Sequence, residues 1–478
     1  MNKKSVVTNF IWRFLERIGA QGVHFVVSIV LARMLNPEVY GTIALVTVFT
    51  TIMQVFIDSG LGTALIQKKD ADDTDFSTVF YFNMAMCIVL YGIMFLIAPL
   101  IAAFYGIPEL TPIIRVLSLT LIISGIRGIQ QSYVSRTMQF KRFFFSTLGA
   151  TFVSAGVGIF MAYKGYGVWA LVGQTLASNV VSTVILWITV KWRPKLLFSF
   201  QRLKGLFSYG WKLLASSLID TVYKDIRSLI IGKKYSSESL AFYNKGQQFP
   251  KLIVDNINTS IDSVLLPAMS SEQDDRERVK AMTRRAIKTS TYIMAPLMIG
   301  LAAVGRPLIE LLLTEKWLPC VPFMRVFCLT YMIYPIHTAN LNAIKAMGRS
   351  DMFLKLEIIK KFIGMAVLLC TMWISVEAMA YSLLFTAVTS SFINASPNKK
   401  LLNYSYFEQI KDILPALLLA TVMGVAVYLV GFIGLNSILT LLIQIPLGVV
   451  IYVGGSIVFK NETFKDLFSV IKGFLKKA

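Results

Sequence analysis

The chain consists largely of long apolar runs, which recur at the length needed to cross a lipid bilayer. A transmembrane helix takes about 20 mostly apolar residues, and fourteen runs of spanning length are separated here by polar residues. They lie near 8–32, 41–66, 77–104, 111–135, 143–162, 167–190, 206–231, 240–266, 287–305, 321–344, 354–374, 377–396, 412–431 and 437–458. We therefore predict an all-α polytopic membrane protein with about 14 transmembrane helices.

The composition supports this class and excludes several others. Of the 478 residues, 55% are hydrophobic and only 15% are charged, whereas an average soluble domain has about 25% charged residues. This composition rules out a soluble enzyme, a coiled coil and a disordered chain. The four cysteines show no CxxC spacing and there are only two histidines, so we expect no metal site and no cofactor.

The excess of basic residues is also explained by a membrane. The chain has 47 Lys and Arg against 26 Asp and Glu. With a cytoplasmic N-terminus, 30 of the basic residues fall in cytoplasmic segments and six in loops on the opposite side. This asymmetry follows the positive-inside rule. We therefore expect a multi-pass protein of the cytoplasmic (inner) membrane with both termini cytoplasmic, and no nucleic-acid partner.

Two segments of the first half have weak counterparts in the second half. The segment 31–41 corresponds to 230–246, and 135–144 corresponds to 344–353. Such pairs are typical of a six-helix unit used twice. The domains that we predict are an N-terminal six-helix lobe (1–195), a C-terminal six-helix lobe (196–400), two additional transmembrane helices (401–460) and a cytoplasmic amphipathic tail (461–478). The basic stretch 191–205 is predicted to lie on the membrane surface between the lobes.

Polar and charged residues recur at helical spacing in four of the predicted spans. They are Arg13, Glu16, Arg17, Gln21, His24 and Ser28 in the first span; Thr47, Thr51, Gln54 and Asp58 in the second; Lys212, Ser216, Asp220, Lys224 and Arg227 in the seventh; and Asn244, Gln248, Lys251, Asp255, Thr259 and Asp262 in the eighth. A charge at the bilayer centre costs about 2.5–3.5 kcal/mol on insertion scales, so these stripes are not expected to face lipid. The repeat makes the first and seventh spans equivalent, and likewise the second and eighth. We predict that the four stripes line one hydrated central cavity.

Structural ion pairs are the alternative interpretation of these charges. Asp220 and Lys224 are one helical turn apart, as are Lys251 and Asp255, so each pair can neutralise itself. A cavity rich in arginine and lysine instead indicates an anionic ligand such as phosphate or diphosphate. The carboxylates that are candidates for binding protons or Na+, with a salt-bridge role open for each, are Asp58, Asp220, Asp225 and Asp255. Arg325 lies at a span end, where snorkelling to the interface is sufficient.

Five stretches of the sequence are similar to segments of a known transporter family. They are LARMLNPEVYG (31–41), IDSGLGTALIQKKD (57–70), LIIGKKYSSESLAFYNKGQQFP (229–250), RPLIELLLTEKWLPCVPFMRV (306–326) and NAIKAMGRSD (342–351). On these stretches the chain resembles the polysaccharide transporter family, the Wzx-type flippases of the multidrug/oligosaccharidyl-lipid/polysaccharide exporter superfamily. The resemblance covers residues 1 to about 400. The chain departs from the family's pattern at Ala241 and Thr314, where glycine is usual, and this leaves the substrate open.

The resemblance implies a flippase that moves a polyprenyl-diphosphate-linked oligosaccharide across the cytoplasmic membrane by alternating access. The oligosaccharide would be a repeat unit of lipopolysaccharide, capsule or exopolysaccharide. Basic residues of the first, seventh and eighth helices would hold the anionic head of the lipid, at positions that match Arg13, Arg17, Lys224, Arg227 and Lys251. Gln21 is a further cavity candidate, since an amide hydrogen-bonds sugar hydroxyls. The expected partners are the lipid-linked oligosaccharide, membrane lipids, and polysaccharide polymerase and chain-length machinery.

Two other functions remain open at this stage. A cation-coupled multidrug antiporter of the same superfamily would need an acidic or aromatic cavity, whereas the stripes, with the adjacent Lys245 and Asp225, hold seven basic and six acidic residues. A membrane glycosyltransferase or polymerase would need a catalytic domain, and no predicted extracytoplasmic loop is large enough for one. We therefore expect no enzyme activity. Because the chain has no GxxxxGK[ST] motif, we expect an ion gradient or the substrate gradient to drive transport.

Overall fold

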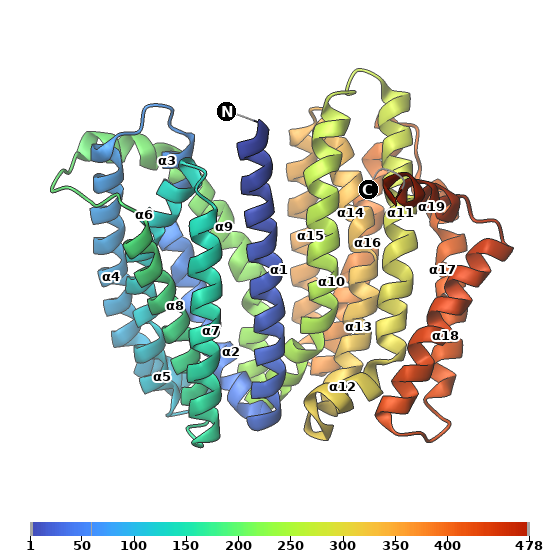
Figure 1. Ribbon diagram of the computed structural model, residues 1–478, viewed down its shortest axis with the longest axis horizontal. Coiled ribbons are helices and arrows are strands. Elements are labelled where there is room, and N and C mark those ends of the chain that lie inside the picture. Colours follow the sequence, from blue (N-terminus) through green and yellow to red (C-terminus); the bar gives the residue numbers. More distant parts are fainter. Residues whose placement is uncertain (1–2, 59, 476–478) are drawn as a thin grey trace. The chain divides into compact units, whose positions relative to one another are not determined.

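The computed structural model describes residues 3–58 and 60–475, except for the side chains of residues 3–11, 13–18, 209, 470–471 and 473–475. In this part of the chain every regular element is a helix (Figure 1). The helices are α1 (Lys3–Met34), α2 (Pro37–Asp58), α3 (Leu61–Gln67), α4 (Asp73–Tyr105), α5 (Leu110–Leu117), α6 (Leu119–Arg136), α7 (Lys141–Tyr163), α8 (Val168–Thr189), α9 (Phe200–Lys234), α10 (Ser237–Ser270), α11 (Arg276–Ala303), α12 (Gly305–Leu313), the 3-10 helix η1 (Glu315–Cys320), α13 (Val321–Met332), α14 (Tyr334–Ala346), α15 (Ser350–Thr371), α16 (Val376–Leu401), α17 (Tyr406–Val430), α18 (Ser437–Val458) and α19 (Glu462–Leu475).

Ten helical segments of the described chain are long and apolar enough to cross a membrane. The other four predicted spans coincide with α1, α9, α10 and α15. These four helices carry the charged stripes or, in α15, a cluster of charges, and these charges lower their hydropathy. In α1, the apolar helical stretch runs from Gly19 to Met34. The count of fourteen spans stays a prediction.

Three predicted spans differ from the continuous helices expected for them. The run 111–135 forms α5 and α6, which meet at Ser118, and the run 321–344 forms α13 and α14. In the latter, Pro335 stands in the first turn of α14, where proline is tolerated because its missing N–H would have no helical partner. The run 41–66 forms α2 and α3, and Gly60 before α3 has a φ of 71°. Glycine adopts this left-handed conformation without steric cost.

The chain divides into two compact units, residues 1–241 and residues 242–478. Unit 1 contains α1–α9 and the first residues of α10, and unit 2 contains the rest of α10 and α11–α19. The boundary between the units therefore falls inside α10. The lobe boundary at 195/196, which was placed by sequence, lies before α9 and stays a prediction.

In unit 1 the apolar core lies between α2, α4, α5, α6 and α8. Its fully buried members include Val46, Cys87, Met94, Leu110 and Ile114. Gly125 of α6 permits this packing, because an added Cβ would lie 2.4 Å from the Sγ atom of Cys87. The core holds the helices that flank the polar stripes in fixed positions.

Two glycines bring α2 into close contact with the end of α9 and with the start of α10. A Cβ on Gly41 would lie 1.6 Å from the carbonyl oxygen of Ser237, and one on Gly232 would lie 2.2 Å from Cδ2 of Leu45. Next to this contact, the hydroxyl of Tyr105 at the end of α4 donates to the carbonyl of Leu229 at 3.4 Å. The α2 helix therefore packs closely against the end of α9 and the start of α10, and the missing Cβ atoms of the two glycines allow this approach.

Unit 2 has a second core, in which α11 packs against α13, α14 and α17, and α17 against α18. Tyr292 of α11 and Tyr452 of α18 meet here with ring centroids 5.1 Å apart, and the Tyr452 hydroxyl donates to the carbonyl of Tyr292 at 2.8 Å. Phe464 and Leu467 of α19 pack against this cluster. The predicted amphipathic tail is thus helical, and two of its apolar residues cover unit 2. Its contact with the membrane surface stays a prediction.

Candidate functional site

The polar stripe of α9 is largely accessible in unit 1. Lys212, Ser216 and Lys224 are exposed, and Asp220 is half-buried. Exposed charges on a helix that crosses a membrane need water or a polar neighbour, because lipid provides neither. This accessible face supports the prediction that α9 borders a hydrated space.

Arg227, one turn beyond Lys224, differs from the rest of the stripe because only 4% of it is exposed. Its Nε and Nη2 atoms are buried and have no hydrogen-bond partner among the residues that the structure describes. A buried charge that lacks partners costs several kcal/mol, so such a group is retained only where something else needs it. A guanidinium in this state has donors to spare for an anion, and its role in substrate binding stays a prediction.

On α10 in unit 2, Lys251 and Asp255 form the ion pair that their spacing allowed. The Nζ atom of Lys251 lies 2.5 Å from Oδ2 of Asp255, and the two side chains are 54% and 51% exposed. Thr259 and Asp262 continue the exposed face, and the Oδ1 atom of Asp262 accepts a hydrogen bond from Asn342 of α14 at 2.8 Å. The alternative of a local ion pair is confirmed here, but the pair is accessible to solvent.

Lys245 does not share the exposed face of α10, although it was counted with the stripe charges. It is only 5% exposed, and its Nζ atom lies 5.4 Å from the ring centre of Trp317. Counting Lys245 among the charges of the predicted cavity was therefore wrong. The cause is the helical period: residue 245 lies six positions before Lys251, or 600° of rotation, which places it well away from the stripe.

On α2, Thr47, Thr51 and Asp58 are exposed. The carboxylate of Asp58 accepts a hydrogen bond from Gln54 at 3.0 Å and interacts electrostatically with Arg127 of α6. Arg127 lies half-buried within α6, and its Nε atom has no hydrogen-bond partner in the described part of the chain. Arg127 thus provides a positive charge beside Asp58, the last residue of the α2 stripe.

The remaining predicted residues are only partly described. The side chains of Arg13, Glu16 and Arg17 lie outside the described residues, whereas Gln21 is half-buried on α1. Asp225 is half-buried and interacts electrostatically with the adjacent Lys224. The stripes of α1, α2 and α9 belong to unit 1 and that of α10 to unit 2, so their convergence around one axis stays a prediction.

Motif analysis missed a cluster of carboxylates at the start of α4. Two Asp-x-Asp triplets, 70–72 and 73–75, have a spacing that can bind a metal. In the structure, basic side chains form ion pairs with these carboxylates instead. Arg202 lies 2.5 Å from Asp72 and Lys195 lies 2.6 Å from Asp73. Lys68 lies 2.7 Å from Asp75. The cluster therefore has a structural role.

These ion pairs fasten the basic segment between α8 and α9 to α4. The backbone N–H groups of Lys195 and Ser199 donate at 3.0 Å to the hydroxyls of Ser77 and Thr78. The hydrogen bond from Arg202 lowers the pKa of Asp72 to about 2. The predicted surface linker is thus a fixed part of unit 1.

Comparison with known proteins places this architecture among proteins of polysaccharide export. A family model described as "Polysaccharide biosynthesis protein" matches residues 30–322. The succinoglycan biosynthesis transport protein ExoT of Rhizobium meliloti (strain 1021) is 23% identical over 73% of this chain and 71% of its own length. The teichuronic acid biosynthesis protein TuaB of Bacillus subtilis (strain 168) is 28% identical over 63% of each chain.

Among solved structures, the fold is similar to that of the lipid II flippase MurJ in an inward closed conformation. The TM-score is 0.75 at 17% sequence identity, and the match covers 97% of this chain and 100% of that chain. The similarity concerns the fold, since the identity is low.

Proposed function

Because the chain belongs to the polysaccharide biosynthesis protein family, we propose that it is a flippase for polyprenyl-diphosphate-linked oligosaccharide. It carries a repeat unit of lipopolysaccharide, capsule or exopolysaccharide from the cytoplasmic to the outer leaflet of the cytoplasmic membrane. Fourteen helices, arranged as two six-helix lobes and two additional helices, cross the membrane with both termini in the cytoplasm. The similarity to ExoT, a succinoglycan biosynthesis transport protein, and to MurJ, a lipid II flippase, supports this proposal.

The observation that carries the proposal is the buried guanidinium of Arg227 with two nitrogens that lack partners. A diphosphate offers several anionic oxygens and accepts charge-assisted hydrogen bonds in the planar geometry that arginine provides. An organic cation would add a second positive charge beside it. The same group therefore favours an anionic substrate over the substrate of a multidrug antiporter.

In this proposal the other basic stripe residues share the anionic head as it moves. Lys224 is exposed one turn before Arg227, and Lys251 is exposed on α10 beside a carboxylate that can release it. Arg13 and Arg17 of α1 complete the set, and Gln21 binds sugar hydroxyls. Alternating access then transfers the head between the two leaflets while the polyprenyl chain stays in lipid.

We assign the energy coupling to the stripe carboxylates Asp58, Asp220, Asp225 and Asp255. A carboxylate that exchanges a basic partner for a proton or Na+ favours one state of the transporter over the other. Asp255, paired with Lys251, provides the simplest form of this exchange: binding of the diphosphate by Lys251 would free the carboxylate.

Reconstitution tests the proposal. The purified full chain is placed in vesicles that contain a fluorescent polyprenyl-diphosphate-linked oligosaccharide, with and without proton or Na+ gradients. A membrane-impermeant quencher reports the fraction of label on the outer face, which is expected to rise faster than in protein-free vesicles and more slowly with the variant Arg227→Gln. A diacyl phospholipid that carries the same label is the matched control.

Two results would contradict the proposal. One is no transfer of the oligosaccharide lipid above the protein-free rate under any gradient. The other is equal transfer of the control phospholipid, which would make the protein an unspecific scramblase. Efflux of organic cations from the same vesicles, without lipid transfer, would establish the multidrug antiporter instead.

A further inference from the structure

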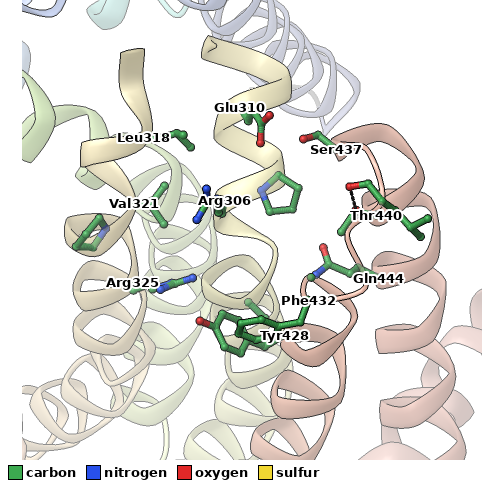
Figure 2. Close-up of a pocket in the computed structure, with 15 residues that line it drawn as sticks. Arg306, Glu310, Leu318, Val321, Arg325, Tyr428, Phe432, Ser437, Thr440 and Gln444 are labelled. Carbon is green, nitrogen blue, oxygen red and sulfur yellow. Dashed lines mark hydrogen bonds between the residues drawn. The ribbon is translucent and has the colours of Figure 1, made fainter. Parts of the chain in front are cut away.

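Unit 2 contains a cavity of about 560 Å³ at the end where α11 connects to α12 and α17 connects to α18 (Figure 2). Its walls come from α12, α13, α17 and α18. The volume lies within the range of about 300–1,000 Å³ that is typical of small-molecule sites. None of its lining residues belongs to the polar stripes.

Two arginines supply free donors on one side of this cavity. Arg306 makes no ion pair and no side-chain hydrogen bond with any described residue, and neither does Glu310, one turn along α12. Arg325 donates from Nε to the carbonyl of Ala302 at 3.3 Å, and its guanidinium lies 5.1 Å from the ring centre of Tyr428. Its terminal nitrogens have no hydrogen-bond partner in the described chain.

A buried acceptor without a partner lies on the opposite side. Gln444 of α18 is 1% exposed, and its Nε2 atom donates to the carbonyl of Val427 at 2.8 Å. Its Oε1 atom is buried, and no described residue donates a hydrogen bond to it. The nearby hydroxyl of Thr440 already donates to the backbone of its own turn. A buried polar atom of this kind calls for a ligand or water that donates a hydrogen bond.

The base of the cavity is aromatic and open to lipid. Figure 2 shows the rings of Tyr428 and Phe432 between the two arginines and Gln444. Phe432 is 71% exposed, and Leu435 beyond it is also exposed. An apolar chain that leaves the cavity past these residues would pass directly onto the apolar outer face of α18.

We propose that this cavity binds the headgroup of a lipid that carries a phosphate and, beside it, a hydrogen-bond donor. The phosphate lies between Arg306 and Arg325, which have donors to spare for its oxygens. The neighbouring hydroxyl or ammonium group donates to Oε1 of Gln444, and Glu310 disfavours a second free anion. The hydrocarbon chain leaves past Phe432.

The site goes beyond the proposed function, which assigns substrate binding to the stripes. With the topology of that proposal, the connections that form the cavity face the outer leaflet. Two kinds of lipid in that leaflet carry such a headgroup: a membrane phospholipid such as phosphatidylglycerol, and the lipid-linked sugar after its transfer. The experiment below tests the two lipids separately.

The test is native mass spectrometry of the purified full chain with three added lipids. These are phosphatidylglycerol, a polyprenyl-diphosphate-linked monosaccharide, and diacylglycerol, which lacks the phosphate. We expect the double variant Arg306→Gln/Arg325→Gln to bind at least one of the two phosphate lipids about tenfold more weakly than wild type, since charge-assisted hydrogen bonds are lost. The variant Gln444→Leu is expected to weaken the binding of the same lipid. Arg285→Gln, an exposed arginine of α11 outside the cavity, is the matched control.

Each outcome decides the proposal. A loss confined to phosphatidylglycerol assigns the site to a membrane lipid, and a loss confined to the polyprenyl lipid assigns it to the transported lipid. Equal binding of both phosphate lipids by wild type and the double variant overturns the proposal, as does tight binding of diacylglycerol at the same site. Arg306 is exposed, so the single variant Arg306→Gln gives the same answer if the double variant fails to fold. Binding is measured without transport, so failure of the flippase proposal leaves this result unchanged.

Discussion

The ammonium group of Lys251 lies 2.5 Å from the carboxylate of Asp255, one helical turn further along α10, and about half of each side chain is exposed. An exposed pair of this kind contributes only about 0–1 kcal/mol to stability. Lys251 can therefore leave Asp255 for an anionic ligand at little cost. In the proposed function, the ion pair and the ligand-bound form are two states of the same residues.

The first prediction concerns this pair. Lys251→Gln is expected to lower transfer of the lipid-linked oligosaccharide about tenfold, the effect of losing one charge-assisted contact, without a marked change in thermal stability. If Lys251 only neutralises Asp255, the double variant Lys251→Gln/Asp255→Asn would recover wild-type transfer in the vesicle assay. We expect the double variant to remain impaired. Lys400→Gln, an exposed lysine of α16, is the control.

The second prediction concerns Arg227. Replacement by methionine removes a buried charge that lacks partners, so Arg227→Met is expected to stabilise the ligand-free protein by about 1 kcal/mol or more. The same change is expected to abolish transfer. Thermal unfolding in detergent and the vesicle assay measure the two effects. A variant that is less stable than wild type would show that the guanidinium has a structural partner, and Arg285→Gln controls for the loss of an arginine.

The third prediction concerns the close contact of α2 with the start of α10. Gly41→Ala places a methyl group against the backbone of Ser237 and is expected to destabilise the protein by about 1–3 kcal/mol, as overpacking does. Gly92→Ala in α4, where a Cβ meets nothing within 4 Å, is the matched control and is expected to be neutral or stabilising. Equal unfolding temperatures for the two variants would contradict the packing described for Gly41.

The fourth prediction is a pH dependence. The pKa of Asp72 is lowered to about 2 by Arg202, whereas the pKa of an aspartate in an unfolded chain is about 3.9. The stabilisation by Asp72 is therefore fully present above about pH 4 and is lost as the pH falls from about 4 to about 2. The stability difference between wild type and Asp72→Asn is expected to be constant from neutral pH to about pH 5 and to shrink below pH 4. A difference that grows on acidification would contradict the pairing.

The fifth prediction concerns topology. Reporter fusions at Lys164 and Lys316 are expected to be extracytoplasmic, and fusions at Lys195 and Arg284 cytoplasmic. The positive-inside distribution of the loops is the physical reason. The opposite result at any of the four positions would contradict the arrangement of fourteen spans.

The sequence was sufficient to predict the helices but not the breaks within them. Because hydropathy only sums side-chain transfer energies, it predicted one continuous helix for each of the runs 41–66, 111–135 and 321–344. The interruptions near Gly60 and Ser118 depend on local backbone geometry and on packing, which a hydropathy sum does not contain. Periodicity placed the accessible residues Lys224 and Lys251 on polar faces.

Periodicity could not show how each polar residue of the site is buried. Lys245 is close to the stripe in sequence but lies over Trp317, a residue brought to it from η1 by tertiary packing. Arg227 follows the spacing of an exposed stripe but is buried. The cavity that holds Arg325 and Gln444 is formed by helices far apart in the chain, so no local pattern predicted it.

The attachment of segment 190–199 to α4 has a consequence for dividing this protein into two separately expressed fragments. A cut before Lys191 would leave Asp72 and Asp73 in the first fragment while Lys195 and Arg202 went to the second. The first fragment would then expose a cluster of like charges with few cations to balance it. A cut at the boundary between the two units, inside α10, keeps Lys195 and Arg202 in the same fragment as these carboxylates, so the cluster stays neutralised.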